Sequence, residues 1–292
     1  DGPIIGNRAT PNQMKPLTDA DMIEEGAKDK QILLVEDNKI NQKASIAILE
    51  KLGFRNISLA ENGQSALEMI RNNPYDLVLM DVQMPVMDGY EATIKVREME
   101  IEKDRNRVPI IAQTANAMKG DKEKCLNAGM DDHISKPIDR KELVKVLNLW
   151  IDTGNENKRL EKSASINLEK EHEKTSLPVF DYKTALTRYS DDHEILREIV
   201  QAFLEECPED FELIKAGITA RDASAIAQAA HSVKGSASYV GAERLKDAAY
   251  KIETIAKSGD LSKVAVMADT ITNEFLFFKE KIEIFQWEEL NG

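Results

Sequence analysis

Five polar side chains in the first half of the chain have the types needed for phosphate chemistry. They are Glu36, Asp37, Asp81, Thr114 and Lys136, and each follows a short apolar run. Three carboxylates held together repel one another, and a hard cation that binds oxygen ligands, such as Mg²⁺, relieves that repulsion. The lysine adds a second cation and the hydroxyl a hydrogen bond to a transferring phosphoryl group. We therefore expect a magnesium-assisted site in which Asp81 is the nucleophile and forms an acyl phosphate.

The elements that position these residues follow from a repeated pattern. Short apolar runs at 32–35, 57–60, 77–80, 110–113 and 132–135 each precede a helical pattern. This alternation predicts right-handed crossovers and a doubly wound parallel sheet of about five strands with helices on both faces. Sites in such sheets lie at the carboxyl ends of the strands, so the five residues should converge on one rim.

The second half contains a candidate for a second phosphoryl acceptor. Residues 230–242 read AHSVKGSASYVGA and place His231, Lys234 and Gly235 on one face of a helix. The imidazole can accept a phosphoryl group, the lysine can attract and neutralise it, and the glycine leaves room for a partner. Ser238 could form a hydrogen bond nearby. The alternative is a histidine that only packs; zinc is disfavoured because no His, Cys or carboxylate lies three or four residues away.

After Pro178 the sequence indicates helices without strands. Apolar residues recur at three- and four-residue steps in 195–204 and 261–285, and further helices are expected near 211–218, 223–239 and 242–257. Antiparallel helices joined by short turns predict a four-helix bundle with an extra helix or two.

Four segments are expected along the chain. They are a flexible N-terminal segment at 1–29, an α/β domain at 30–151, a linker at 152–178 and a helical domain at 179–292. The linker is rich in Lys, Glu, Ser and Asn, and if it is flexible its about 27 residues span roughly 30 Å. The two domains can therefore meet within one molecule.

Composition excludes several other classes of protein. The net charge is -13, and residues 179–292 hold 13 basic against 21 acidic side chains, so direct nucleic-acid binding has little electrostatic support. No apolar run approaches the roughly 20 residues that span a bilayer, and we expect no membrane contact. The two cysteines fall in different domains, which argues against a disulfide framework. The first residues lack a basic start followed by an apolar stretch, as in a secretory signal, so we expect a cytoplasmic location. No Gly-rich phosphate loop indicates an ATP site, so whether the chain is itself an enzyme stays open.

The first domain resembles the response-regulator receiver family. The resemblance rests on LLVEDN at 33–38, LVLMDVQMPVMDG at 77–89, QTANAM at 113–118 and SKPI at 135–138. It implies a flavodoxin-like fold, Asp81 as the phosphoacceptor, and Mg²⁺ bound by Asp37, Asp81 and the backbone carbonyl of Gln83, with Glu36 assisting through water. It also implies that Thr114 and Lys136 contact the phosphoryl group and that the Lys136–Pro137 bond is cis.

Three positions within this resemblance call for comment. His133 stands where the family usually has Tyr or Phe as a mobile switch residue, so its role as a switch stays open. Gln83 and Asn116 flank the expected pocket and are candidates for tuning hydrolysis. Gln83 also argues against an aspartyl phosphatase class that requires a second aspartate there.

The second domain resembles the histidine-containing phosphotransfer (HPt) family, through the run at 230–242 and the bundle at about 179–286. The resemblance implies that His231 is phosphorylated. Together the two resemblances predict a two-component phosphorelay: Asp81 accepts a phosphoryl group from a histidine of an upstream kinase, passes it to His231 by contact within the chain, and His231 delivers it to the receiver aspartate of a downstream response regulator. Reverse flow is also open. The alternatives are the C-terminal part of a hybrid sensor histidine kinase, and a signalling adaptor that is not phosphorylated.

Overall fold

The structure is a computed structural model that describes residues 23–115, 119–151 and 177–287. Residues 1–22, most of the expected linker and Asn116 lie outside the described residues. Residues 23–29 differ from the flexible segment expected there, because Glu25–Ala27 form a short 3-10 helix (η2) and both Ile23 and Ala27 are buried. These apolar side chains join the core of the first domain and anchor the segment.

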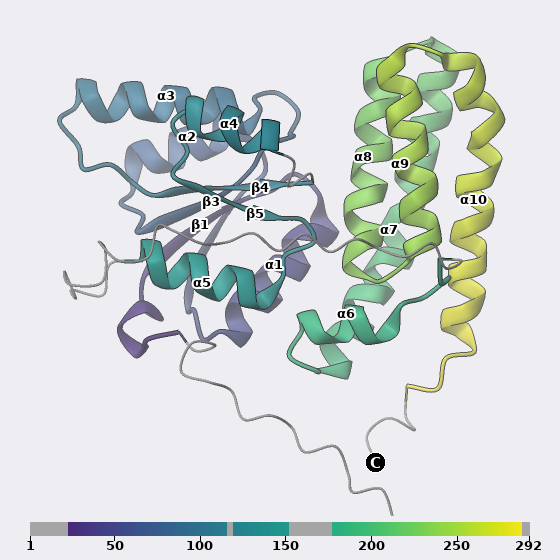
Figure 1. The fold of residues 1–292 in the computed structure, drawn as a ribbon, viewed down its shortest axis with the longest axis horizontal. Coiled ribbons are helices and arrows are strands. Elements are labelled where there is room, and N and C mark those ends of the chain that lie inside the picture. Colours follow the sequence, from purple (N-terminus) through teal and green to yellow (C-terminus); the bar gives the residue numbers. More distant parts are fainter. Residues whose placement is uncertain (1–22, 116–118, 152–176, 288–292) are drawn as a thin grey trace, which may run out of the picture.

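The first domain is a five-stranded parallel sheet, as the alternating pattern predicts (Figure 1). Its strands are β1 (Gln31–Val35), β2 (Asn56–Ala60), β3 (Leu77–Asp81), β4 (Ile110–Thr114) and β5 (Asp132–Ser135). Their order across the sheet is β2-β1-β3-β4-β5, and every neighbouring pair is parallel. β3 is central, so the carboxyl end that carries Asp81 lies between the ends of β1 and β4.

Helices cover both faces of this sheet. They are α1 (Lys39–Lys51), α2 (Gly63–Asn72), α3 (Gly89–Glu102), α4 (Lys119–Asn127) and α5 (Arg140–Trp150). Helices α1 and α5 lie on one face, and α2, α3 and α4 on the other (Figure 1). Because both faces are covered, β3 and β4 are buried along their whole length, which explains why they read as continuous apolar runs.

The second domain is a helical bundle. Its helices are α6 (Tyr182–Arg188), α7 (His193–Ala220), α8 (Ala223–Tyr239), α9 (Glu243–Ser258) and α10 (Leu261–Glu283). Aspartates begin two of the long helices: Asp192 caps α7 and Asp222 caps α8, each accepting two backbone N–H bonds. Four long helices and the short α6 agree with the predicted bundle with an extra helix.

The bundle differs from the sequence prediction at one place. Separate helices were expected at 195–204 and 211–218, but α7 runs unbroken through both, with Pro208 inside it. The buried side chains Phe203, Cys207 and Phe211 continue the same face across the proline, so packing against the bundle outweighs the lost backbone hydrogen bond.

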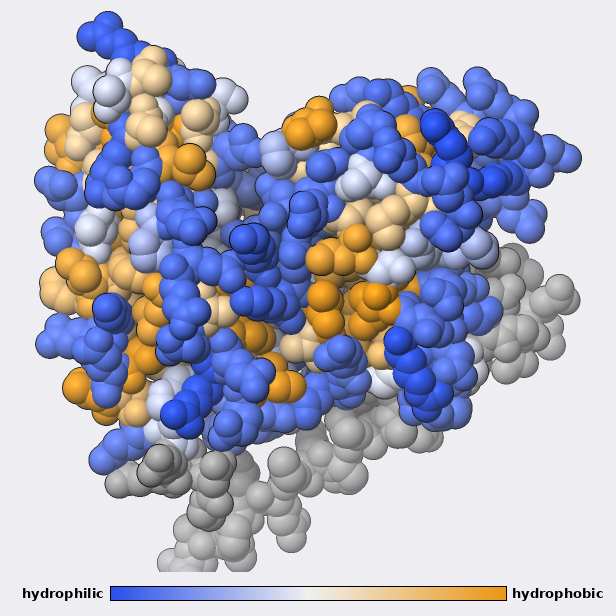
Figure 2. Space-filling view, turned by 180° about the vertical axis from the view of Figure 1, so that it is seen from behind, coloured by the Kyte–Doolittle hydropathy of each residue, from blue (hydrophilic) through white to orange (hydrophobic). Residues whose placement is uncertain are grey.

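The two domains pack together through α1. This helix lies against α7 and α8, and the carboxyl ends of the strands point toward the bundle (Figure 1). The buried apolar residues of the α1 and α5 side form one continuous cluster with the core of the bundle. Seen from behind, two lobes are separated by a hollow lined mainly by hydrophilic residues (Figure 2). Among the described helices, none has the length and apolar character required to cross a membrane.

Candidate functional site

The ends of β1 and β3 bring three carboxylates together. One ligand oxygen from each of Glu36, Asp37 and Asp81 lies within 4.8 Å of the others, and both Glu36 and Asp81 are buried. Burial raises the pKa of Glu36 to about 7 and that of Asp37 to about 6, and the charge of Asp81 adds to both shifts. Crowded oxygen ligands whose charges oppose one another are a donor set that suits a hard divalent cation such as Mg²⁺.

Lys136 reaches this cluster from the end of β5. Its Nζ lies 2.5 Å from Oε2 of Glu36 and 2.8 Å from Oδ2 of Asp81, and its side chain is buried. Burial alone would lower the pKa of Lys136, but the charges of Asp81 and Glu36 raise it well above its ordinary value. The lysine is therefore a fixed cation beside the expected nucleophile. Lys136 directly follows the last residue of β5, Ser135, and its peptide bond to Pro137 is cis.

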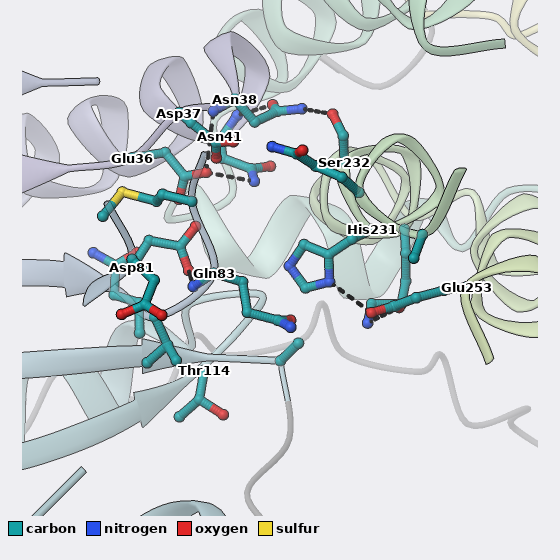
Figure 3. A pocket seen from close by; sticks show the side chains of 18 of the residues that line it. Glu36, Asp37, Asn38, Asn41, Asp81, Gln83, Thr114, His231, Ser232 and Glu253 are labelled. Carbon is teal, nitrogen blue, oxygen red and sulfur yellow. Dashed lines mark hydrogen bonds and ion pairs between the residues drawn. The ribbon is translucent and has the colours of Figure 1, made fainter. Parts of the chain in front are cut away.

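Thr114 and Gln83 complete the first half of the site. Thr114 ends β4 and is buried, and its neighbour Gln113 is paired with Asp81 across the sheet. The backbone N–H of Gln83 donates to Oδ1 of Asp81 at 3.2 Å, and its side chain extends between Asp81 and the second domain (Figure 3). The roles predicted for the Thr114 hydroxyl and the Gln83 carbonyl remain predictions.

His231 lies on α8 and is held by a glutamate that the sequence analysis missed. Nδ1 of His231 is 3.0 Å from Oε1 of Glu253, whose Oε2 lies 2.5 Å from Nζ of Lys234. Lys257 also contacts Glu253, at 2.6 Å. Burial would raise the pKa of Glu253, but the hydrogen bond from His231 and the charges of His231 and Lys234 keep it well below its usual range.

This arrangement selects the reactive nitrogen. An ionised carboxylate only accepts hydrogen bonds, so Nδ1 of His231 must carry a proton and donate it to Glu253. In the neutral ring the other nitrogen, Nε2, then holds the lone pair. In Figure 3 the ring points from α8 toward the end of the sheet, with Glu253 behind it. Within α9, Glu253 is a buried acid on an otherwise apolar face, and this was the sequence signal for it.

Both acceptors line a single cleft between the domains. The cleft measures about 660 Å³, and Asp81, Gln83 and Thr114 line it from the sheet, while His231 and Lys234 line it from the bundle. Figure 3 shows the imidazole facing the acidic cluster, with Gln83 between them. Most of the expected site residues therefore line one cleft: Glu36, Asp37, Asp81, Gln83, Thr114, His231 and Lys234. Lys136 is not among the lining residues but contacts Glu36 and Asp81.

A hydrogen-bond chain joins the domains next to His231. Nδ2 of Asn38 donates to Oγ of Ser232 at 2.7 Å, and that hydroxyl donates to Oδ2 of Asp210 at 2.9 Å. A Cβ on Gly235 would lie 3.0 Å from Nδ2 of Asn41, so the glycine permits the close approach of α1. Ser238 donates to the carbonyl of Gly235 at 2.6 Å, a bond within its own helix.

Tyr239, like Glu253, was missed by sequence reasoning, and it lies at the interface between the domains. It is fully buried at the end of α8, and its hydroxyl lies 3.4 Å from both Oγ of Ser45 and the backbone N–H of Ile138. A tyrosine beside the phosphotransfer motif carries no signal that it contacts another domain, because its partners are far away in sequence.

His133 lies on β5 at some distance from this chemistry. Its backbone N–H donates to Oδ1 of Asp132 at 2.9 Å, its ring is partly exposed, and it is not among the described residues that line the cleft. Its role as a switch remains a prediction.

Two family models match separate parts of the chain. A family model for the response regulator receiver domain matches residues 32–148, and one for the Hpt domain matches residues 198–280. The sensor histidine kinase GacS of Pseudomonas protegens is 32% identical over 237 residues, which are 81% of this chain and 25% of that protein. The chain thus spans about a quarter of the length of this curated relative.

Two solved structures are similar to part of this chain. The complex of the Saccharomyces cerevisiae phosphotransfer protein Ypd1 with the receiver domain of its downstream response regulator Ssk1 is similar at 33% identity and a TM-score of 0.41, over 42% of this chain and 90% of that chain. The magnesium-bound receiver domain of the sensor histidine kinase PA1611 from Pseudomonas aeruginosa is similar at 47% identity and a TM-score of 0.38, over 42% of this chain and 98% of that chain.

Proposed function

The chain contains a response-regulator receiver domain followed by an Hpt domain, and we propose that it carries a phosphoryl group between Asp81 and His231 in a two-component phosphorelay. The observation that carries this proposal is the shared cleft, which both acceptors line from opposite domains. The order of transfer is upstream kinase histidine, then Asp81, then His231, then the aspartate of a downstream receiver.

The first step loads Asp81. A carboxylate oxygen of Asp81 attacks the phosphorus of the donor phosphohistidine, a P–O bond forms, and the P–N bond breaks with release of the donor imidazole. Lys136, at 2.8 Å from Asp81, offsets the charge that develops on the phosphoryl oxygens. Mg²⁺, held by Glu36, Asp37, Asp81 and the Gln83 carbonyl, would supply further charge neutralisation when bound.

The second step moves the group to the bundle. Nε2 of His231 attacks the acyl phosphate, a P–N bond forms, and the P–O bond to Asp81 breaks, which regenerates its carboxylate. Glu253 keeps the proton on Nδ1 and offsets the positive charge on the ring as Nε2 bonds to phosphorus. Lys234 lies in the same cluster and can bind the phosphoryl oxygens.

The partners follow from these steps. The proposed donor is the phosphohistidine domain of a histidine kinase, and the proposed acceptor is the receiver of a response regulator. GacS is a sensor histidine kinase and matches this chain over both domains, which supports a parent protein of the hybrid sensor kinase type. We also propose a cytoplasmic setting, because Cys125 and Cys207 are both buried free thiols, as expected in a reducing compartment.

A labelling experiment tests the proposal. The full chain, Asp81→Asn and His231→Gln are each incubated with Mg²⁺ and radiolabelled acetyl phosphate as a small donor. We expect base-labile acyl phosphate in His231→Gln, additional acid-labile phosphoramidate in the unchanged chain, and neither in Asp81→Asn. Acid-labile label in Asp81→Asn would show that His231 is loaded without Asp81. A complete lack of label in all three proteins would instead favour the adaptor that is not phosphorylated.

A further inference from the structure

We propose that the Hpt domain selects receivers through two acidic residues, Asp192 and Glu206, that bind lysines on a receiver's first helix, and that the chain's own receiver competes with a second receiver for this face. The inference rests on the proposed phosphorelay function. It concerns residues outside the phosphoryl site, and it names the chemistry of the partner: a receiver whose first helix presents two cations about two turns apart.

Two ion pairs across the domain boundary carry the first step of the argument. Nζ of Lys43 lies 2.9 Å from Oε1 of Glu206, and Nζ of Lys51 lies 2.5 Å from Oδ2 of Asp192. The lysines are eight residues apart on α1, a rise of about 12 Å. Lys43, nearer the start of α1, pairs with Glu206 within α7, whereas Lys51, at the end of α1, pairs with Asp192 at the start of α7. The two helices therefore run in opposite directions, and the pairs define the register between them.

The contacts of α1 extend along its whole length. From its beginning to its end, Asn38 contacts Ser232, Lys43 contacts Glu206, Ser45 contacts Tyr239 and Lys51 contacts Asp192. A receiver that replaces this helix must place its own first helix in the same position. The two acids then lack a cationic partner unless the incoming helix also carries cations there.

The strength of these pairs suits selection better than permanent attachment. All four charged side chains are between 27% and 52% exposed, and pairs of this kind contribute little net stability to a folded protein. Charges at the edge of an interface mainly change association rates and discriminate against wrong partners. The Hpt half is strongly acidic as a whole, which favours basic partner surfaces further.

Competition follows from the position of His231. Its ring faces the cleft that the chain's own receiver closes from the other side (Figure 3). A second receiver must bring its aspartate to the same Nε2, so both cannot bind at once. The tethered receiver therefore has to leave before His231 can exchange a phosphoryl group with another protein.

Transfer between two copies of the chain tests both parts of the proposal. The donor is the His231→Gln chain, labelled on Asp81 with acetyl phosphate and Mg²⁺ and then freed of the reagent. The acceptor is the Asp81→Asn chain, and the rate at which acid-labile label appears on its His231 is measured. The donor stays the same in every arm, and only the acceptor is varied.

Two acceptor variants break the same ion pairs from opposite sides. Lys43→Glu with Lys51→Glu weakens docking of the acceptor's own receiver, because it replaces two attractions by repulsions, and leaves the acids intact. We therefore expect transfer to rise roughly threefold or more. Glu206→Lys with Asp192→Asn also weakens docking of that receiver, but it removes the acids that attract the donor. Asn at 192 retains the helix cap. Transfer to this variant should stay well below that to the lysine variant.

Matched controls complete the design. Lys95→Glu changes a lysine on α3 that pairs with Glu91 away from the boundary, and should behave like the parent acceptor. Lys43→Glu combined with Glu206→Lys restores one pair in reversed polarity and should slow transfer again relative to Lys43→Glu alone. Thermal unfolding checks that each variant folds.

The outcomes separate this inference from the proposed function. If the lysine variant accepts label no faster than the parent, the tethered receiver does not compete. If the two double variants accept label at the same rate, the acids do not select the receiver. Either result overturns the inference while leaving the phosphorelay intact. If the donor never acquires label on Asp81, or no acceptor acquires label on His231, the proposed function itself fails.

Discussion

Nδ1 of His231 and Oε1 of Glu253 lie 3.0 Å apart, and this contact joins α8 to α9 directly behind the proposed phosphoryl acceptor. Removing the carboxylate charge should slow loading of His231. We expect Glu253→Gln to reduce transfer from Asp81 to His231 roughly tenfold, the effect of losing one charge-assisted hydrogen bond.

Two measurements separate this positioning role from a loss of folding. ¹⁵N NMR of the ring should show the proton on Nδ1 in the parent chain and a mixture of tautomers in Glu253→Gln. Glu243→Gln, an acid on the same helix that pairs with Lys246, is the control and should leave both the tautomer and the rate unchanged. Normal transfer in Glu253→Gln would remove Glu253 from the mechanism.

The charge of Asp37 should favour Mg²⁺ binding and destabilise the metal-free fold. Its pKa is raised to about 6 because burial and the charge of Asp81 disfavour its ionised form. A raised pKa in the folded state means that the charge destabilises the fold at pH 7.5, where the group is ionised. Asp37→Asn should therefore raise the melting temperature in EDTA, and weaken Mg²⁺ binding at least tenfold in a calorimetric titration. Unchanged Mg²⁺ affinity would exclude Asp37 as a ligand.

The Tyr239 hydroxyl should matter for docking of the domains and not for loading of Asp81. Tyr239→Phe leaves the backbone N–H of Ile138 without this acceptor and removes the contact to Ser45. A loss of about 1 kcal/mol, or roughly fivefold in the docked population, is expected for one neutral hydrogen bond. Transfer from Asp81 to His231 should slow accordingly, while labelling of Asp81 by acetyl phosphate stays normal.

Tyr189→Phe is the matched control for this prediction. The Tyr189 hydroxyl donates to the backbone carbonyl of Tyr239 at 3.2 Å inside the bundle. Its removal should lower the melting temperature of the bundle with a smaller effect on transfer. A larger effect on transfer from Tyr189→Phe than from Tyr239→Phe would contradict the assignment.

Asp210 should make stability depend on pH. Burial raises its pKa to about 6, and the hydrogen bond from Ser232 only partly opposes this. The folded state thus binds a proton more tightly than the unfolded chain, so this group stabilises the fold at low pH and ceases to do so as pH rises through 6. Asp210→Asn, which can still accept from Ser232, should raise stability by about 1–2 kcal/mol at pH 7.5 and change little at pH 3.5. Thermal unfolding at both pH values checks this, with Glu212→Gln, an exposed acid on the same helix that pairs with Lys215, as the control. An equal effect of Asp210→Asn at both pH values would contradict it.

Much of the fold follows from local pattern. The five strand runs and the helix Ala223–Tyr239 were predictable because apolar spacing reports burial directly. The convergence of Glu36, Asp81 and Lys136 was predictable as well, because parallel strands bring their carboxyl ends to one edge of a sheet. The pattern misled at Pro208, where a local helix breaker is tolerated by packing that involves distant residues.

The sequence by itself determined two domains, their fold classes and a candidate phosphoryl acceptor in each. The reason is that residues which follow a strand, or which share one face of a helix, are recognised by their regular spacing along the chain. Only the tertiary structure decided that Glu253 lies behind His231, that Tyr239 contacts the first domain, and that α1 is the helix packed on the bundle. The physical reason is that spacing shows which side chains share a face, whereas the pairing of faces depends on the shapes and charges of residues far apart in the chain.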